Sequence, residues 1–282
     1  MAYERFKTLR VTTDDGIARL TIDHPPVNML DTALITELKQ FADEVRVDET
    51  VRVIVAGSAN DDFFIAHVDL GFMLQPETFA DLASVAEQGS TLNPMQSLND
   101  QFSSLPQVTI AKLAGRLRGG GNEFAMAFDM RFAAIGKTWL SQPETRMGIM
   151  PGGGGTQLLT RLVGRARALE VILGGDLYDA VTAEKYGWVN LALPADQLDT
   201  AVDAYARRVA ALRPEQIKAA KQAVDAALTA TSLTSGMEQE GEALAAVYPA
   251  PEFIVERMRA AVEGGIQTRE GEFDLEASLD RY

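Results

Sequence analysis

The sequence GRLRGGGNEFAMAFDMRFAA, residues 115–134, places three consecutive glycines directly before a predicted helix. The segment VTIAKLAG, residues 108–115, predicts a strand before the glycines, and MRFAAIG, residues 130–136, predicts the strand that follows the helix. A strand, a glycine turn, a helix and another strand in this order predict an α/β fold.

The same alternation is present on the N-terminal side of the glycines. GIARLTID, residues 16–23, and VRVIVAG, residues 51–57, are short apolar segments that predict strands. Between them, apolar residues recur at helical spacing up to about residue 46, and Asp31 is the expected N-cap of that helix. The alternation supports an α/β fold over the N-terminal half.

The pattern changes from about residue 157, where one predicted helix follows another, with a short strand predicted in GWVNLAL, residues 187–193. The segment 196–263 is rich in alanine and other strong helix formers. We therefore expect an α/β core over residues 1–195 and a helical region over residues 196–282. The helical region needs a surface to pack against, on the core or on another subunit.

Composition excludes several classes of function. The 282 residues include no cysteine, and the two histidines, His24 and His67, are isolated, so we expect no metal site. A formal charge of −14 opposes nucleic-acid binding. No apolar run is long enough to cross a bilayer and the N-terminus has no apolar signal-peptide core, so no membrane association and a cytoplasmic location are expected.

The glycines permit two interpretations. They can form a tight strand-to-helix turn, or they can bring a ligand's negative charge to the free N–H groups at the helix start. Neither glycine cluster, residues 119–121 or 152–155, fits the G-x-G-x-x-G dinucleotide pattern or a P-loop, and G-x-S-x-G is absent. Phosphate loops and a serine-hydrolase elbow are therefore unsupported.

Four blocks of sequence stand out: FFIAHVDL (63–70), residues 115–134 quoted above, SQPETRMGIMPGGGGTQLL (141–159) and RALEVILGGDLYDAVTAEKYGWVN (167–190). In this order and at these spacings, they resemble the enoyl-CoA hydratase/isomerase (crotonase) superfamily over roughly residues 10–225. The resemblance implies a crotonase-type spiral of ββα units, with a C-terminal helical region that mediates trimers. It also implies an acyl-CoA substrate that brings its own coenzyme A, so no separate cofactor is expected.

By motif position, the resemblance implies that the backbone N–H groups of Val68 and Gly120 bind the thioester carbonyl and stabilise the enolate that forms from it. Donors fixed at a helix start suit such a developing charge. The residues that this resemblance implies for substrate binding are Ala66, Val68, Asp69, Leu70, Gly119 and Gly120.

Two glutamates match the hydratase positions, Glu123 in the first turn of the helix and Glu144 after Pro143. In the hydratases that this chain resembles, such a pair orients a water and moves its proton. Helix-dipole chemistry predicts an ionised Glu123, with a more desolvated partner that is held protonated. Taken singly, Glu123 is most simply a first-turn glutamate that complements the helix dipole, and Glu144 is most simply a surface-loop carboxylate.

The predicted function is reversible hydration of a 2-enoyl-CoA. The alternatives are an enoyl-CoA isomerase, another crotonase-type reaction such as a decarboxylase or dienoyl isomerase, and a non-catalytic trimeric acyl-CoA-binding relative. The presence of both glutamates favours the hydratase, because isomerases of the family often keep one. A homotrimer or a dimer of trimers is the expected assembly.

The chain departs from the family pattern at two positions near these residues. Arg118 stands where a small or apolar residue is usual, and either it pairs with Glu123 or Glu144 and lowers the pKa of that carboxyl, or it binds a substrate carboxylate, or it faces solvent. His67 stands where glycine is usual, and we expect a packing role for it. In the segment 71–105, Phe72, Met73, Leu74 and Phe79 line either the acyl pocket or the core.

Overall fold

The computed structural model describes residues 3, 5–75, 77 and 91–278. It divides into two compact units, residues 1–214 and residues 215–282, and each is described by itself. Phe79 lies outside the described residues, so its predicted place in the acyl pocket or the core stays a prediction.

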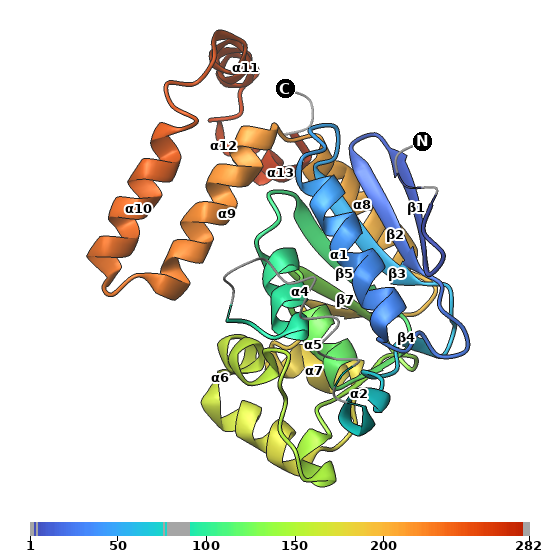
Figure 1. The fold of residues 1–282 in the computed structure, drawn as a ribbon. Helices are drawn as coiled ribbons and strands as arrows, with labels where there is room; N and C mark the ends of the chain where they lie inside the picture. Colours follow the sequence, from blue (N-terminus) through green and yellow to red (C-terminus); the bar gives the residue numbers. More distant parts are fainter. Residues whose placement is uncertain (1–2, 4, 76, 78–90, 279–282) are drawn as a thin grey trace. The chain divides into compact units, whose positions relative to one another are not determined.

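A six-stranded sheet forms the centre of the first unit (Figure 1). Its strand order is β1-β2-β3-β5-β7-β10; β1 and β2 are antiparallel and the following pairs are parallel. The strands span β1 (Leu9–Asp14), β2 (Ile17–Ile22), β3 (Val53–Ser58), β5 (Val108–Leu113), β7 (Met130–Ala134) and β10 (Leu191–Leu193). The strands predicted around residues 17–22, 53–57, 108–113 and 130–134 are thus confirmed.

A second sheet of four short strands was not predicted. Its order is β4-β6-β8-β9, in which β4, β6 and β8 are parallel and β9 is antiparallel to β8. The strands are β4 (Phe63–Ile65), β6 (Arg116–Arg118), β8 (Trp139–Ser141) and β9 (Tyr178–Asp179). The chain turns from β5 into β6 at Gly115, where a Cβ would lie 2.7 Å from the backbone nitrogen of Phe63. The segment 108–115, predicted as one strand, is therefore followed by a separate strand in the other sheet.

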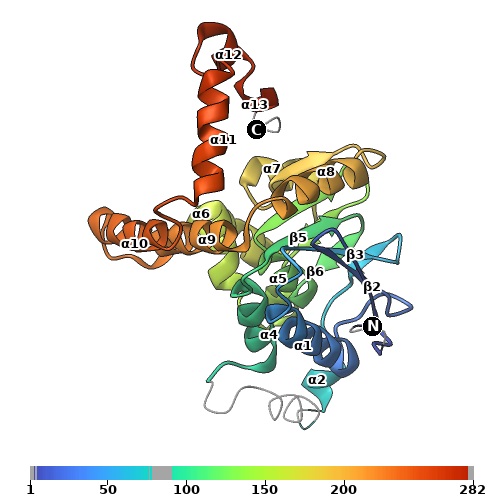
Figure 2. The ribbon, with the colours of Figure 1, turned by 90° about the horizontal axis from the view of Figure 1, so that it is seen from above.

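Helices cover both faces of the six-stranded sheet. Helix α1 (Thr32–Arg46) begins at Asp31, whose carboxylate accepts a 2.9 Å hydrogen bond from the Leu34 N–H, which confirms the predicted cap. Leu34, Leu38 and Phe41 of α1 pack into the main core with one face of the sheet. Helix α8 (Leu198–Ala210) lies on the opposite face, as Figure 2 shows.

Helix α8 belongs to the first unit, although the sequence placed the start of the C-terminal helical region at residue 196. Its buried residues Val202 and Ala206 lie on the sheet, and the Tyr205 ring lies 5.8 Å from the ring of Phe132 on β7. Helical composition marks where strands stop, but burial of an apolar sheet face decides which helix packs on the core.

The remaining helices of the first unit follow strands of the second sheet. They are α2 (Gly71–Leu74), α4 (Pro94–Ser103), α5 (Gly120–Met126), the 3-10 helix η1 (Glu144–Met147), α6 (Gly155–Gly174) and α7 (Ala180–Tyr186). Three times, a strand of the large sheet is followed by a strand of the small sheet and then by a helix. The predicted mixed α/β class is confirmed.

The second unit consists of helices, as the composition predicted. They are α9 (Pro214–Thr229), α10 (Leu233–Ala245), α11 (Glu252–Glu263), α12 (Arg269–Phe273) and α13 (Leu275–Ser278). Large apolar side chains on these helices are exposed: Val224, Leu228, Leu233, Met237, Leu244, Phe253, Met258, Val262 and Phe273. In the part of the chain that the structure describes, no helix has the length and apolar character needed to cross a membrane.

Candidate active site

The small sheet gathers the predicted site residues at one edge. Strands β4, β6 and β8 are parallel neighbours, so their carboxyl ends lie side by side. The chain leaves β4 into residues 66–70, β6 into Gly119 and Gly120, and β8 into Gln142 and Glu144. Loops at the carboxyl ends of parallel strands are a frequent place for ligand sites. Segments that are far apart in the sequence are thereby brought together.

Each of the three glycines contacts a different part of this edge. Gly119 has a φ of +52°, and a Cβ there would lie 2.9 Å from Oε1 of Glu144. A Cβ on Gly120 would overlap Cγ2 of Val68, and one on Gly121 would lie 2.5 Å from the Ile65 carbonyl oxygen. A larger residue at any of these positions would push the three segments apart.

Two backbone amides at this edge have no acceptor. In the described residues, neither the N–H of Val68 nor that of Gly120 donates a hydrogen bond to the protein. The flanking groups of Val68 are held in place: the Leu30 N–H donates to the His67 carbonyl at 2.9 Å, and the Asp69 N–H donates to the Leu30 carbonyl at 3.1 Å. Gly120 begins α5, where N–H groups lack an intrahelical partner. Both donors are therefore available to an oxygen atom of a ligand.

Glu123 is buried, with 3% of its surface exposed. Its Oε1 accepts hydrogen bonds from the N–H groups of Gly155, at 2.8 Å, and Gly153, at 3.0 Å, and its Oε2 lies 3.1 Å from the same Gly153 nitrogen. Gly153 and Gly155 lie at the start of α6, so the carboxylate from α5 caps another helix. The second glycine cluster, residues 152–155, thus holds Glu123 in position, a role that its sequence did not reveal.

Glu144 is half-buried at the start of η1 and is held less tightly. The side-chain nitrogen Nε2 of Gln142 lies 3.3 Å from its Oε1 and 3.5 Å from its Oε2. A Cβ on Gly155 would lie 2.7 Å from Oε1 of Glu123 and 2.8 Å from that same Gln142 nitrogen. The buried amide of Gln142 is therefore close to both carboxyl groups, and no sequence motif had marked it.

Both carboxyl groups favour their protonated forms more than exposed glutamates do. Burial raises the pKa of Glu123 to about 7; the charge of Glu144 adds to the rise, and the Gly155 and Gly153 amides oppose it. Burial also raises the pKa of Glu144. The sequence had placed the stronger desolvation at the partner carboxyl, but burial is the largest influence on the pKa of Glu123 itself and outweighs the Gly155 and Gly153 donors.

Arg118 does not pair with either glutamate. In the described residues it forms no ion pair, and burial lowers the pKa of its guanidinium, with the charge of Arg116 adding to the effect. Arg116 and Arg118 share one face of β6, because Leu117 between them points into the core. Of the alternatives for Arg118, pairing with Glu123 or Glu144 therefore has no support in the described residues, and binding of a substrate carboxylate stays a prediction.

His67 contacts the loop that carries the Val68 amide. Its ring nitrogen Nδ1 lies 2.8 Å from the Val68 carbonyl oxygen, so the ring holds the peptide that follows Val68 when Nδ1 carries the proton. The packing role that the sequence favours for His67 stays a prediction.

The other predicted binding residues surround Val68. Ala66 is buried, Leu70 is exposed, and Oδ1 of Asp69 accepts a 2.8 Å hydrogen bond from the Gly71 N–H at the start of α2.

The candidates for the acyl pocket or the core differ in exposure: Phe72 packs into the core, whereas Met73 and Leu74 are exposed. Met95 on α4 was not predicted, yet its Cε would lie 3.6 Å from a Cβ on Gly120 and its Cβ 3.2 Å from one on Gly153.

A comparison with protein-family models matches residues 12–256 to the enoyl-CoA hydratase/isomerase model. The chain belongs to the enoyl-CoA hydratase/isomerase family. Members of this family act on acyl-CoA substrates, and the match covers all the residues that meet at the edge of the small sheet.

Individual relatives agree with this assignment. The crystal structure of a candidate enoyl-CoA hydratase from Streptomyces avermitilis is 44% identical, covers 98% of this chain and 100% of that chain, and superposes with a TM-score of 0.74. An enoyl-CoA hydratase structure from Bacillus anthracis is 26% identical, covers 92% of this chain and 97% of that chain, and has a TM-score of 0.81.

A longer relative contains a region similar to this family member. The fatty acid oxidation complex subunit alpha of Shewanella baltica is 34% identical over 276 residues, which are 93% of this chain but 37% of that protein. The chain thus spans little more than a third of the length of that relative.

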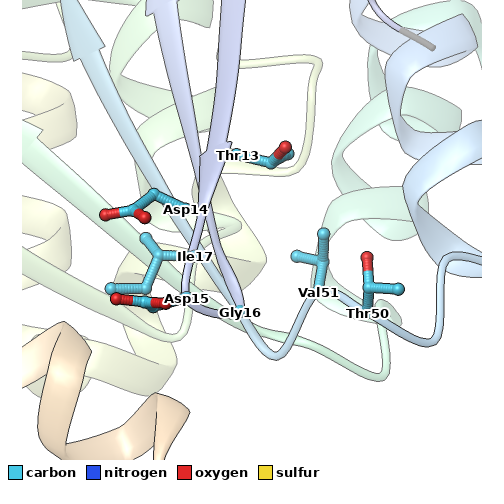
Figure 3. Close-up of a pocket in the computed structure, with 7 residues that line it drawn as sticks. All are labelled: Thr13, Asp14, Asp15, Gly16, Ile17, Thr50 and Val51. Carbon is cyan, nitrogen blue, oxygen red and sulfur yellow. The ribbon is translucent and has the colours of Figure 1, made fainter. Parts of the chain in front are cut away.

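A depression of about 190 Å³ lies elsewhere on this hydratase/isomerase family member (Figure 3). It is lined by the β1–β2 turn and the start of β3, at the amino ends of the parallel strands, whereas the glutamates follow carboxyl ends. Arg207 lies 3.7 Å from Asp14 and 3.6 Å from Asp15 at this turn. The lining residues are Thr13, Asp14, Asp15, Gly16, Ile17, Thr50 and Val51.

Proposed function

We propose that this chain catalyses the reversible addition of water to a 2-enoyl-CoA thioester. The observation that carries the proposal is that two buried or half-buried carboxyl groups and two unoccupied amides meet at one edge of the small sheet. Glu123 and Glu144 supply the carboxyls, and Val68 and Gly120 supply the amides. Water addition needs both an electrophilic thioester and a pair of groups that can take and return a proton.

The two amides are assigned to the thioester carbonyl oxygen. When water attacks C3 of the enoyl group, the C2–C3 π electrons move toward the carbonyl and negative charge develops on its oxygen. Two N–H donors fixed in a buried site stabilise that enolate, each by on the order of 3 kcal/mol. Val68 and Gly120 keep this geometry because glycine lets the two segments touch.

The two carboxyl groups are assigned to the proton. One carboxylate removes a proton from water as the C3–O bond forms, and the carboxyl pair returns a proton to C2 of the enolate, so that H and OH are both added and no other reactant is consumed. A group with a pKa of about 7, as Glu123 has, populates its protonated and ionised forms about equally near neutral pH, so it can both take and give a proton. The coenzyme A belongs to the substrate, and we propose no separate cofactor.

Assembly into a homotrimer or a dimer of trimers is part of the proposal. The exposed apolar side chains of α10 and α11, among them Met237 and Phe253, are surfaces of the kind that partner subunits cover. Light scattering of the purified protein would measure the mass directly. A monomer at micromolar concentration would contradict this part and leave the assigned chemistry untouched.

The test of the reaction uses purified protein with crotonyl-CoA and longer 2-enoyl-CoAs, and follows loss of the absorbance of the conjugated thioester. We expect turnover with at least one chain length, and a loss of about 100-fold or more in Glu144→Gln. No turnover across the series, or full activity in Glu144→Gln, would overturn the assignment. Isomerisation without water uptake would identify an isomerase, and binding without any turnover would identify a non-catalytic relative.

A further inference from the structure

A pair of buried amide side chains lies behind Glu144. Asn122 on α5 and Gln142 after β8 are both fully buried, and Nδ2 of Asn122 donates a hydrogen bond to Oε1 of Gln142. Gln142 in turn presents its Nε2 to the two oxygens of Glu144, at 3.3 and 3.5 Å. Asn122, Gln142 and Glu144 thus form a chain of three side chains that ends on a proposed proton-transfer group.

The outer end of this chain has no hydrogen-bond partner. Oδ1 of Asn122 is buried and accepts no hydrogen bond from any described residue. On the same side chain, Nδ2 has one further neighbour, the sulfur of Met126 at 4.0 Å, which is a weak acceptor. A buried polar atom without a partner is rare and costly in proteins, so its presence calls for a reason.

An amide side chain offers a donor on one side and an acceptor on the other, and a half-turn exchanges them. If both amides turn, Nε2 of Gln142 donates to Oδ1 of Asn122, and Oε1 of Gln142 faces Glu144. The first arrangement suits an ionised Glu144, which needs a donor. The second suits a protonated Glu144, which needs an acceptor for its O–H. In both arrangements one polar atom of the Asn122 amide has no hydrogen-bond partner, so Asn122 favours neither arrangement over the other.

We propose that Asn122 and Gln142 turn together with each change in the protonation state of Glu144, so that Glu144 keeps a hydrogen-bond partner whether it holds the proton or has given it up. The proposal rests on the proposed hydration, in which the carboxyl pair alternates between these states. Asn122 is then a positioning residue, which acts on Glu144 through Gln142. The protonation state of Glu144 then determines which of its two arrangements the Asn122–Gln142 amide pair adopts.

Few charges other than the carboxyl pair act on Glu144. Glu123, on α5, is the group whose charge is coupled to it, and a proton on either carboxyl lowers the cost of ionising the other. Arg146, in η1 itself, lies 3.9 Å from Asp176. The remaining charged residues on β6 and α6 make no ion pair with Glu144 in the described structure: Arg116 and Arg118 on β6, and Arg161, Arg165, Arg167 and Glu170 on α6.

The first test compares Asn122→Leu, of similar volume but without an amide, with Asn122→Ser, whose hydroxyl both donates and accepts. We expect kcat of Asn122→Leu to fall about tenfold with a displaced pH profile, because Gln142 loses the partner that turns with it. The KM should change little, because the Val68 and Gly120 amides are untouched. The kcat and the pH profile of Asn122→Ser should lie between those of the wild type and those of Asn122→Leu. A wild-type pH profile in Asn122→Leu would overturn the proposal, because a purely structural role lowers stability without moving the profile.

The second test needs neither turnover nor a variant at Asn122. In the full chain labelled with nitrogen-15 in its glutamine side chains, the Gln142 amide signals, assigned from Gln142→Met, should move as Glu144 titrates and should stop moving in Glu144→Gln. Signals that do not change across the titration would overturn the proposal, even in an active hydratase. Moving signals in a protein that hydrates no enoyl-CoA would contradict the proposed function instead and leave the amide pair in place.

Discussion

The backbone N–H of Gly155 donates a 2.8 Å hydrogen bond to Oε1 of Glu123, so the start of α6 holds a carboxyl group that comes from the start of α5. Because the Gly153 N–H donates to the same carboxylate, Glu123 is fixed by backbone rather than by mobile side chains. The carboxyl therefore stays in place although burial penalises its charge. This combination of fixed position and raised pKa has a measurable consequence for stability.

The pH dependence of stability should reveal the raised pKa of Glu123. The pKa rises from 4.5 to about 7 on folding, so between these values the unfolded chain gives up its proton first, and stability falls as pH rises. From about pH 5 to about pH 8, the wild type should lose about 2.5 kcal/mol of unfolding free energy relative to Glu123→Gln. Urea denaturation at a series of pH values measures the difference. A difference that is independent of pH would show that Glu123 ionises normally.

Close contact between Gly120 and Val68 should be essential for catalysis. In Gly120→Ala, the added Cβ overlaps Cγ2 of Val68 and displaces the Gly120 amide, so kcat/KM should fall about 100-fold. The double variant Gly120→Ala/Val68→Ala removes the overlapping methyl group but keeps both amides, and it should recover part of the loss.

The matched control is Gly241→Ala, on α10, where a Cβ would have no neighbour within 4 Å. It should keep full activity and gain roughly 0.5–1 kcal/mol of stability, because alanine favours the helix. Equal activity losses in Gly120→Ala and in the double variant would contradict the assignment of the displaced amide as the cause.

His67 should matter for the rate more than for substrate binding. Its 2.8 Å contact with the Val68 carbonyl steadies the loop that carries the Val68 amide, a proposed oxyanion donor. His67→Gly should lower kcat about fivefold with little change in KM, because one hydrogen bond of ordinary strength is lost. His67→Asn, whose amide can still donate, should lose less. Steady-state kinetics of the two variants decide this, and an unchanged kcat in His67→Gly would show that the contact has no catalytic effect.

Arg118 should have no influence on the titration of the carboxyl pair. Burial, and not a neighbouring guanidinium, sets the pKa of Glu123 and of Glu144, and Arg118 makes no ion pair with either. The pH profile of kcat should therefore be the same in Arg118→Met and in the wild type. A shift of the profile toward higher pH would mean that Arg118 does hold one carboxylate in its charged form during turnover.

The sequence was most informative where local rules act alone. The Asp31 cap and the strands of the large sheet followed from residue types and periodicity. The small sheet could not be found in this way, because β4, β6 and β8 have three residues each, too few to show a period. This small sheet brings Val68, Gly120 and Glu144 to one edge. Periodicity therefore could not predict that these residues lie close together, and only the family resemblance implied it.

The interactions that tune the site were also out of reach of the sequence. Gln142 and Asn122 belong to no motif, and their roles depend on burial and on which side-chain atoms face each other. The sequence placed Glu123 correctly in the first turn of its helix, but the pKa of its carboxyl depends on lost solvent, which a linear pattern does not report.

In the proposed reaction Glu123 and Glu144 together add water across the double bond of an enoyl-CoA, and the mass of the product formed in water enriched in heavy oxygen measures that addition directly. We predict a 3-hydroxyacyl-CoA heavier than the substrate by one labelled water, and no such product from Glu123→Gln/Glu144→Gln. A product of unchanged mass, or labelled product from the double variant at the wild-type rate, would contradict the claim.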